Sequence, residues 1–170
     1  DVVGDVPSAC PGNYLIGITN TTSSDEKYGS AGYGVNNIDI GAPGTSIYST
    51  LPNNNYGNMT GTSMATPQVS GTIALMYAAL PEEMMIACKN DPANFCLSVR
   101  HHLLNGADHL PSLDGSVASG RRLNAYGAIE SVLYDSIIPT LTGEVNISGE
   151  PFFGETLTAE TNLGSMPSIP

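Results

Sequence analysis

Residues 61–71, with the sequence GTSMATPQVSG, constrain the fold of this chain more than any other segment. The pattern predicts that Ser63 is exposed at the start of a helix over residues 62–80, which Pro81 ends. The start of a helix presents backbone N–H groups without partners and carries a partial positive charge. Ser63 would then direct its own N–H, together with the helix dipole, at any negative oxygen that forms beside it.

Three apolar segments before this serine are typical of strands. Residues 14–19 and 37–44 predict buried strands, the second followed by a turn, and residues 47–52 predict another. Residues 53–55, which are three asparagines, predict the turn of a hairpin. The polar, glycine-rich residues 20–34 predict a surface loop. Strands therefore lead the chain up to the serine.

Helical patterns dominate the chain after the serine. Residues 82–89 and 93–104 predict two helices that separate at the proline between them, because proline disfavours helix at the residue before it. Residues 105–120 predict a loop. A last helix is predicted over residues 123–134, with Asn124 as its N-cap.

Three features of the helix after Ser63 predict how it packs. The nearly continuous apolar run at residues 73–76 predicts burial on most sides. Gly71 lacks a side chain and would let the helix lie close to the sheet. Pro67 is predicted near the first turn, where its missing N–H costs little.

The chain has three cysteines, whose state the sequence leaves open. On one continuous helix Cys88 and Cys96 would lie roughly 12 Å apart, which is too far for a bridge. A helix–turn–helix could bring them together as a disulfide, or both could stay buried thiols that act as small hydrophobes. Cys10 has no evident partner and is predicted to be buried.

The residues around the serine resemble the subtilisin-like serine proteases, the subtilases. That family carries a G-T-S-M-A-x-P-x-V-x-G block around its nucleophile and a D-x-x-A-P-G block upstream, which match residues 61–71 and 39–44 in order. The resemblance covers about residues 7–133. It implies that Ser63 is the nucleophile and that its backbone N–H belongs to the oxyanion hole. For Thr62 two interpretations stay open, which are support of the oxyanion hole and ordinary helix capping.

A serine hydroxyl is a weak nucleophile until a base takes its proton. The subtilase family places an aspartate, a histidine and an oxyanion asparagine before its serine, and no histidine precedes Ser63 here. His101, His102 and His109 all follow it and are interpreted as solvated or packing residues. The resemblance therefore implies that the three partners lie outside this chain, and that the chain alone is an inactive fragment.

The alternation of strands and helices predicts an α/β domain with a mainly parallel sheet. The resemblance implies a three-layer subtilisin-like fold, of which residues 1–137 form only the C-terminal part of the catalytic domain. Alternating apolar and polar residues at 143–149 and 154–159 predict strands after that. Residues 138–170 are therefore interpreted as a short β tail, the truncated start of an Ig-like β domain.

Two functions of different class remain open at this stage. The resemblance implies a serine endopeptidase that works through a Ser-His-Asp acyl-enzyme mechanism. The alternative is a non-catalytic secreted binding or adhesion module with a relic protease segment, which the Ig-like start motivates. The intact block around Ser63 favours the protease.

The charge and composition limit the classes of molecule that this chain could bind. The net charge is −11 with only five Lys plus Arg, which argues against nucleic acid or an anionic membrane as partner. No apolar run reaches the ~18 residues that a membrane span needs. The expected partners are protein or peptide substrates and the N-terminal half of the catalytic domain. The expected location is extracellular, as for a secreted and bacterial protein.

The chemistry that the resemblance implies requires no cofactor. The intact enzyme could hold a structural calcium ion, because the family often binds calcium through loop carboxylates and carbonyls. Asp1, Asp5, Asp25 and Glu26 lack a dense ligand spacing, so the sequence places no such site here. A metal site from His101, His102 and Asp108 matches no zinc spacing.

Overall fold

The computed structural model describes residues 6–10, 12–137, 145–148 and 158–161. The chain divides into two units, residues 1–136 and 137–170, and each is described by itself. In the second unit β7 (Val145–Ser148) pairs with β8 (Thr158–Thr161) in antiparallel fashion. Much of the predicted Ig-like segment lies outside the described residues, so its Ig-like character stays a prediction.

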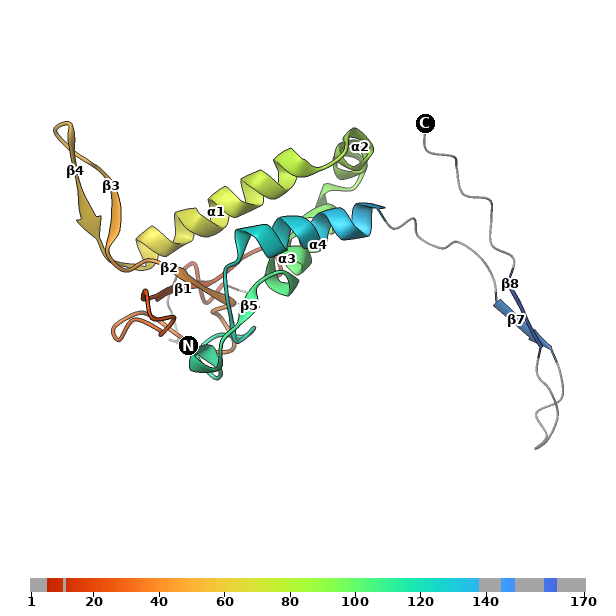
Figure 1. The fold of residues 1–170 in the computed structure, drawn as a ribbon, viewed down its shortest axis with the longest axis horizontal. Helices are drawn as coiled ribbons and strands as arrows, with labels where there is room; N and C mark the ends of the chain where they lie inside the picture. Colours follow the sequence, from red (N-terminus) through yellow and green to blue (C-terminus); the bar gives the residue numbers. More distant parts are fainter. Residues whose placement is uncertain (1–5, 11, 138–144, 149–157, 162–170) are drawn as a thin grey trace. The chain divides into compact units, whose positions relative to one another are not determined.

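A four-stranded sheet organises the first unit, with the strand order β1-β2-β6-β5 (Figure 1). β1 is parallel to β2 and β2 is parallel to β6, whereas β5 is antiparallel to β6. The predicted α/β class with a mainly parallel sheet is thus confirmed. The strands are β1 (Ile18–Thr21), β2 (Ile40–Pro43), β5 (Asp108–His109) and β6 (Arg121–Arg122).

The helices begin and end close to the predicted residues. They are α1 (Thr62–Ala79), α2 (Glu82–Asn90), α3 (Pro92–Asn105) and α4 (Ala125–Ile137), with a 3-10 turn η1 at Pro111–Leu113. The predicted break between α2 and α3 is confirmed, because Asp91 caps α3 by accepting from the Asn94 N–H at 3.3 Å. Asn124 caps α4 as predicted, accepting from the Gly127 N–H at 2.9 Å.

The two faces of the sheet are covered differently. Ile40 and Ala42 of β2 are fully buried and belong to a core that α1, α3 and α4 complete. A second, smaller cluster is formed by Ile38, Leu113 and Val117, the last two from the η1 turn and the residues after it. The helix that carries Ser63, α1, therefore packs into the larger core.

A two-stranded hairpin precedes α1 and extends away from the sheet in Figure 1. β3 (Ile47–Leu51) and β4 (Asn55–Met59) pair in antiparallel fashion. The predicted asparagine turn is confirmed, because Asn53 and Asn54 both adopt positive φ, which asparagine tolerates better than most residues. The hairpin delivers the chain to the start of α1.

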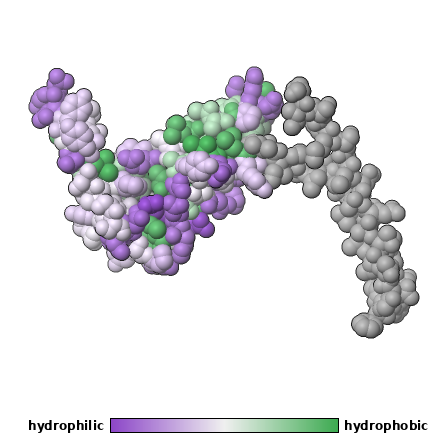
Figure 2. Space-filling view, viewed as in Figure 1, coloured by the Kyte–Doolittle hydropathy of each residue, from purple (hydrophilic) through white to green (hydrophobic). Residues whose placement is uncertain are grey.

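The prediction that α1 is buried on most sides is wrong for this chain. Only one stripe of α1 is buried, and Leu75 on another side is 54% exposed. Figure 2 shows apolar residues gathered at the surface over the C-terminal half of α1. Gly71 does not touch the sheet either, since a Cβ built there meets no atom within 4 Å. The buried stripe consists of Ala65, Val69, Thr72 and Met76.

The prediction for the first strand also needs correction. β1 begins at Ile18, four residues later than predicted, and it includes Asn20 and Thr21, which were predicted to lie in a surface loop. Both are buried. Buried polar side chains usually find hydrogen-bond partners. Oδ1 of Asn20 does so by accepting from the Thr45 hydroxyl at 3.0 Å, whereas Oγ1 of Thr21 has no partner among the described residues.

Three short elements lie between α3 and α4, where the sequence predicted a loop over residues 105–120. Two of these, β5 and η1, lie inside the predicted loop. The third, β6, begins at the residue after it, and its two arginines carry no strand signal. Arg121 donates to the Ala107 carbonyl at 2.8 Å. Hydrogen bonding across the sheet, rather than apolar alternation, defines these strands.

All three cysteines are free thiols in this structure, so neither interpretation of the Cys88–Cys96 pair holds. Cys88 is half-buried and Cys96 is exposed, with its Sγ 3.8 Å from the Tyr77 hydroxyl. Cys10 is exposed rather than buried, because its segment precedes the sheet and reaches no core. Burial, together with the Cys96 contact, raises the pKa of Tyr77 to about 12.

Candidate active site

Ser63 is the second residue of α1 and its side chain is exposed. The Gly61 carbonyl accepts from Met64 N at 3.0 Å and from Ala65 N at 3.3 Å, which closes the first turn. Among the described residues no group accepts from the Ser63 N–H. The serine therefore presents a hydroxyl and an unpaired backbone donor together at the positive end of a helix.

The segment before Ser63 is held by the turn between β2 and β3. The Gly61 N–H donates to the Gly44 carbonyl at 2.9 Å, and the Ser46 N–H donates to the Thr60 hydroxyl at 2.9 Å. The Gly44 N–H donates in turn to the Thr21 carbonyl at 3.3 Å. A continuous chain of hydrogen bonds thus links β1 to the residue that starts α1.

Gly44 permits this approach because it has no side chain. A Cβ at Gly44 would lie 2.6 Å from the Gly61 carbonyl oxygen and 2.7 Å from Oδ1 of Asn20. Real Cβ atoms do not come so close to backbone oxygen, so this turn requires glycine. The glycine of the D-x-x-A-P-G block is therefore explained by contact with the segment that carries the serine.

Thr62 occupies the first helical position of α1, and Gly61 is the N-cap. The interpretation of Thr62 as an ordinary helix cap is therefore wrong, since the capping position is one residue earlier. The Thr62 carbonyl accepts from the Thr66 hydroxyl at 2.9 Å. Support of the oxyanion hole by Thr62 stays a prediction. Pro67 is the sixth helical residue rather than a first-turn residue, so the Ser63 carbonyl lacks the i+4 donor that other residues would provide.

The three histidines each have a partner away from Ser63. His101 contacts Asn105 at 2.7 Å, and His102 contacts the Ser131 hydroxyl at 3.0 Å. The third, His109, contacts Asp114 at 2.9 Å. These contacts agree with the interpretation of the histidines as packing or solvated residues.

Asp39 of the D-x-x-A-P-G block also makes contacts that hold the fold together. Its carboxylate pairs with Arg100 of α3 and accepts from the Gly17 N–H at 2.7 Å. It therefore joins the strand β2 to α3 and to the residue before β1. These contacts give Asp39 a structural role and not that of an aspartate that orients a catalytic base.

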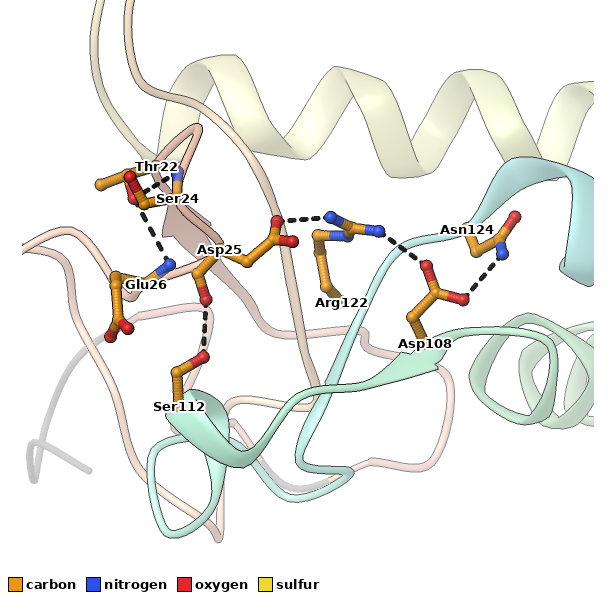
Figure 3. A network of polar contacts seen from close by, with 8 residues as sticks. All are labelled: Thr22, Ser24, Asp25, Glu26, Asp108, Ser112, Arg122 and Asn124. Atoms are coloured by element: carbon orange, nitrogen blue, oxygen red, sulfur yellow. Dashed lines mark hydrogen bonds and ion pairs between the residues drawn. The ribbon is translucent and has the colours of Figure 1, made fainter.

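An ionic network, missed by sequence reasoning, fixes the loop that follows β1 (Figure 3). Arg122 of β6 pairs with Asp25 in that loop and donates to Asp108 of β5 at 2.6 Å. Asp108 also accepts from the Asn124 amide at 2.8 Å, and the Ser112 hydroxyl donates to the Asp25 carbonyl at 2.6 Å. Within the part of the chain that the structure describes, no three His, Cys, Asp or Glu side chains are grouped as a metal site would need.

The hydrogen bonds that Asp108 accepts lead us to expect that the protein loses stability in acid. Hydrogen bonds from Asn124 and then from Arg122 lower the pKa of Asp108 below its ordinary value of 3.8. A lowered folded-state pKa stabilises the fold above the ordinary value, and that stabilisation is lost as the pH falls through the folded-state pKa. Its size is modest, because the Asp108 side chain is 40% exposed and solvent screens the pair.

We therefore expect the urea midpoint of unfolding to stay level above about pH 5 and to decline below about pH 4. Asp108→Asn should flatten that decline, while Glu26→Gln, an exposed control, should leave it unchanged. Urea titrations followed by circular dichroism at several pH values measure both. An identical acid decline in wild type and Asp108→Asn would show that this carboxylate does not contribute.

Comparisons with known proteins identify the family. The profile of the Subtilase family, a family of serine peptidases, matches residues 3–128. This range includes both motif blocks, the sheet and the start of α4. The chain belongs to the subtilase family.

Individual proteins that are similar to this chain agree with the family assignment. Subtilisin E of Bacillus subtilis (strain 168) is 41% identical over 75 residues, which cover 44% of this chain and 19% of that protein. Thermitase of Thermoactinomyces vulgaris is 34% identical over 115 residues, or 68% of this chain and 36% of thermitase. The self-cleaved protease domain of PatA has a similar structure, with a TM-score of 0.58 and 29% identity over 76% of this chain and 44% of that domain. The chain thus spans a minor part of each relative.

Proposed function

We propose that this chain is part of a serine endopeptidase in which Ser63 is the nucleophile. The observation that supports this most directly is the position of Ser63, exposed at the start of α1 with its own N–H unpaired among the described residues. That position lies within the range that the family profile matches. The same range contains the turn at Gly44 that fixes the segment before the serine.

In the proposed reaction the Ser63 hydroxyl attacks the carbonyl carbon of a peptide bond while a histidine takes its proton. The carbonyl oxygen becomes an oxyanion, to which the Ser63 N–H donates. The C–N bond then breaks, the histidine returns the proton to the leaving amine, and an acyl ester forms on Ser63. Water hydrolyses this ester by the same proton transfers in reverse. The histidine, its aspartate and the oxyanion asparagine are proposed to come from residues outside this chain.

The substrates are proposed to be proteins or peptides, in line with membership of a protease family. Within the described residues no helix is long and apolar enough to cross a membrane. Secretion from a bacterial cell is proposed on the similarity to bacterial subtilisins and on the acidic composition. A structural calcium ion in the intact enzyme, and a domain boundary near residue 137, stay predictions.

The experiment is to express the complete reading frame that contains these residues and to follow hydrolysis of unstructured casein. We expect hydrolysis that a serine-directed phosphonofluoridate stops and that a metal chelator does not abolish at once. Absence of hydrolysis by a folded protein, with casein binding retained, would favour the non-catalytic binding module. Hydrolysis that resists the serine reagent would contradict Ser63 as nucleophile.

We also propose that an N-terminal half of the catalytic domain covers the exposed side of α1. The support is the apolar surface over α1, where Leu75 is 54% exposed, and the open space at Gly71. An apolar surface of this kind on a soluble protein usually marks an interface. It lies on the same helix that begins at Ser63.

The effect of Gly71→Ala on stability should then have opposite signs in the 170-residue chain and in the complete protein. In the 170-residue chain alanine has space, and it should stabilise the helix by about 1 kcal/mol because alanine favours helix over glycine. In the complete protein the same change should destabilise, because the covering half would meet the new Cβ. Thermal unfolding of both proteins measures this. Stabilisation of equal size in both would contradict close packing at Gly71.

A further inference from the structure

Asn20 is a polar side chain with no exposure, in the middle of strand β1. Its Oδ1 accepts from the Thr45 hydroxyl at 3.0 Å. Its Nδ2 is buried and has no hydrogen-bond partner among the described residues. Burying an unpaired amide donor is unfavourable, and apolar side chains occupy the corresponding interior positions of β2, Ile40 and Ala42. Filling the core therefore does not explain why an amide side chain is buried at this position.

The Asn20 amide lies against the turn that holds the serine segment. The site that a Cβ of Gly44 would occupy is 2.7 Å from Asn20 Oδ1, 2.9 Å from Asn20 Cγ and 2.6 Å from the Gly61 carbonyl oxygen. Asn20, Gly44 and Gly61 therefore meet at one point. The Gly61 carbonyl is the same oxygen that accepts from Met64 and Ala65 to begin α1.

The hydrogen bond to Thr45 fixes the other side of this turn. Thr45 follows Gly44 directly, and the next residue, Ser46, donates through its N–H to Thr60. The backbone of Asn20 is itself held, since its carbonyl accepts from the Tyr28 N–H at 2.9 Å. The Asn20 side chain thus binds Thr45 from a fixed strand, and the backbone of the neighbouring Gly44 and Ser46 bonds to the two residues that lead into α1, Gly61 and Thr60.

We propose that Asn20 is a positioning residue for the nucleophile, which acts through Thr45, Gly44 and Gly61 to set the start of α1 and the direction of the Ser63 hydroxyl and N–H. The catalytic part of this inference rests on the proposed function of Ser63. Asn20 touches no substrate, because it is fully buried. Its effect is to hold the oxyanion donor and the nucleophile in one place, which catalysis requires to within fractions of an ångström.

The first test needs no activity and uses the 170-residue chain. Thr45→Val removes the hydroxyl that binds Asn20 at nearly equal volume, Thr45→Ser restores it, and Asn20→Ala removes the amide itself. Amide hydrogen exchange reports opening of each segment separately. We expect exchange at residues 61–65 to rise about tenfold in Thr45→Val and Asn20→Ala, to return to wild type in Thr45→Ser, and to stay unchanged in α3. Unchanged exchange at residues 61–65 in Thr45→Val overturns the proposal.

The second test measures kcat and KM of the complete protein with a peptide substrate. We expect Thr45→Val to lower kcat about tenfold with KM within about twofold, and Thr45→Ser to recover it. Val117→Ala, in the separate small core cluster, is the control that lowers stability alone. An equal kcat loss in Val117→Ala, or an unchanged kcat in Thr45→Val, overturns the proposal. If wild type shows no turnover, the proposed function fails, while the exchange result still decides the positioning of α1.

Discussion

Ser63→Ala is expected to abolish peptide-bond hydrolysis by the complete protein while leaving it folded. The Ser63 side chain is exposed, and no residue of the described chain bonds to its hydroxyl, so its removal disturbs no contact. Only the nucleophile is lost. In subtilisin, removal of the nucleophilic serine costs about a million-fold in kcat, and we expect a loss of that order. Release of a chromogenic amine from a peptide anilide measures it.

Ser70→Ala provides a matched control on the same helix. Ser70 is also exposed, and its hydroxyl donates to the Thr66 carbonyl at 3.3 Å within α1. Its replacement should leave kcat within about twofold of wild type, because its hydroxyl bonds only to the backbone of its own helix. Retention of substantial activity by Ser63→Ala, or an equal loss in Ser70→Ala, would contradict the assignment of the nucleophile.

Gly44→Ala is expected to have the largest effect on stability. The new Cβ would stand 2.6 Å from the Gly61 carbonyl oxygen, and it could be accommodated only if the turn or the start of α1 moved. We expect a loss of about 3 kcal/mol in the free energy of unfolding, at the upper end for overpacking. Urea unfolding of the 170-residue chain measures this loss.

Gly32→Ala is the control for Gly44→Ala. A Cβ at Gly32 meets no atom within 4 Å, and its carbonyl can still accept from Thr19. Its free energy of unfolding should stay within about 0.5 kcal/mol of wild type. If Gly44→Ala unfolded as wild type does, the contact between the β2–β3 turn and the serine segment would not be essential to the fold.

The elements next to Ser63 could be predicted because their signals are local. The hairpin turn follows from asparagines that tolerate positive φ, which Asn53 and Asn54 adopt. The break between α2 and α3 follows from an Asp-Pro pair, where Asp91 is the cap and Pro92 the first helical residue. The start of α1 one residue before Ser63 follows from the motif itself. Each depends on a few consecutive residues.

What could not be predicted depends on contacts between distant residues. Asn20 was predicted to lie in a surface loop, yet it is buried in β1, where its Oδ1 accepts from Thr45, 25 residues away in the sequence. Asp25 lies in the segment predicted as a surface loop, yet it pairs with Arg122, and no local pattern links the two residues. The exposed side of α1 could not be predicted either, since its apolar run is the same whether or not a partner covers it.

The most direct measurement is to treat the complete protein with a phosphonofluoridate and to map the adduct by mass spectrometry. An activated serine oxygen displaces fluoride from phosphorus and keeps the phosphonyl group, whereas ordinary serines react far more slowly. The predicted result is one phosphonyl group per chain, on the peptide that contains Ser63, and none in Ser63→Ala. An adduct on another serine, or no adduct on a protein that hydrolyses casein, would contradict Ser63 as the nucleophile.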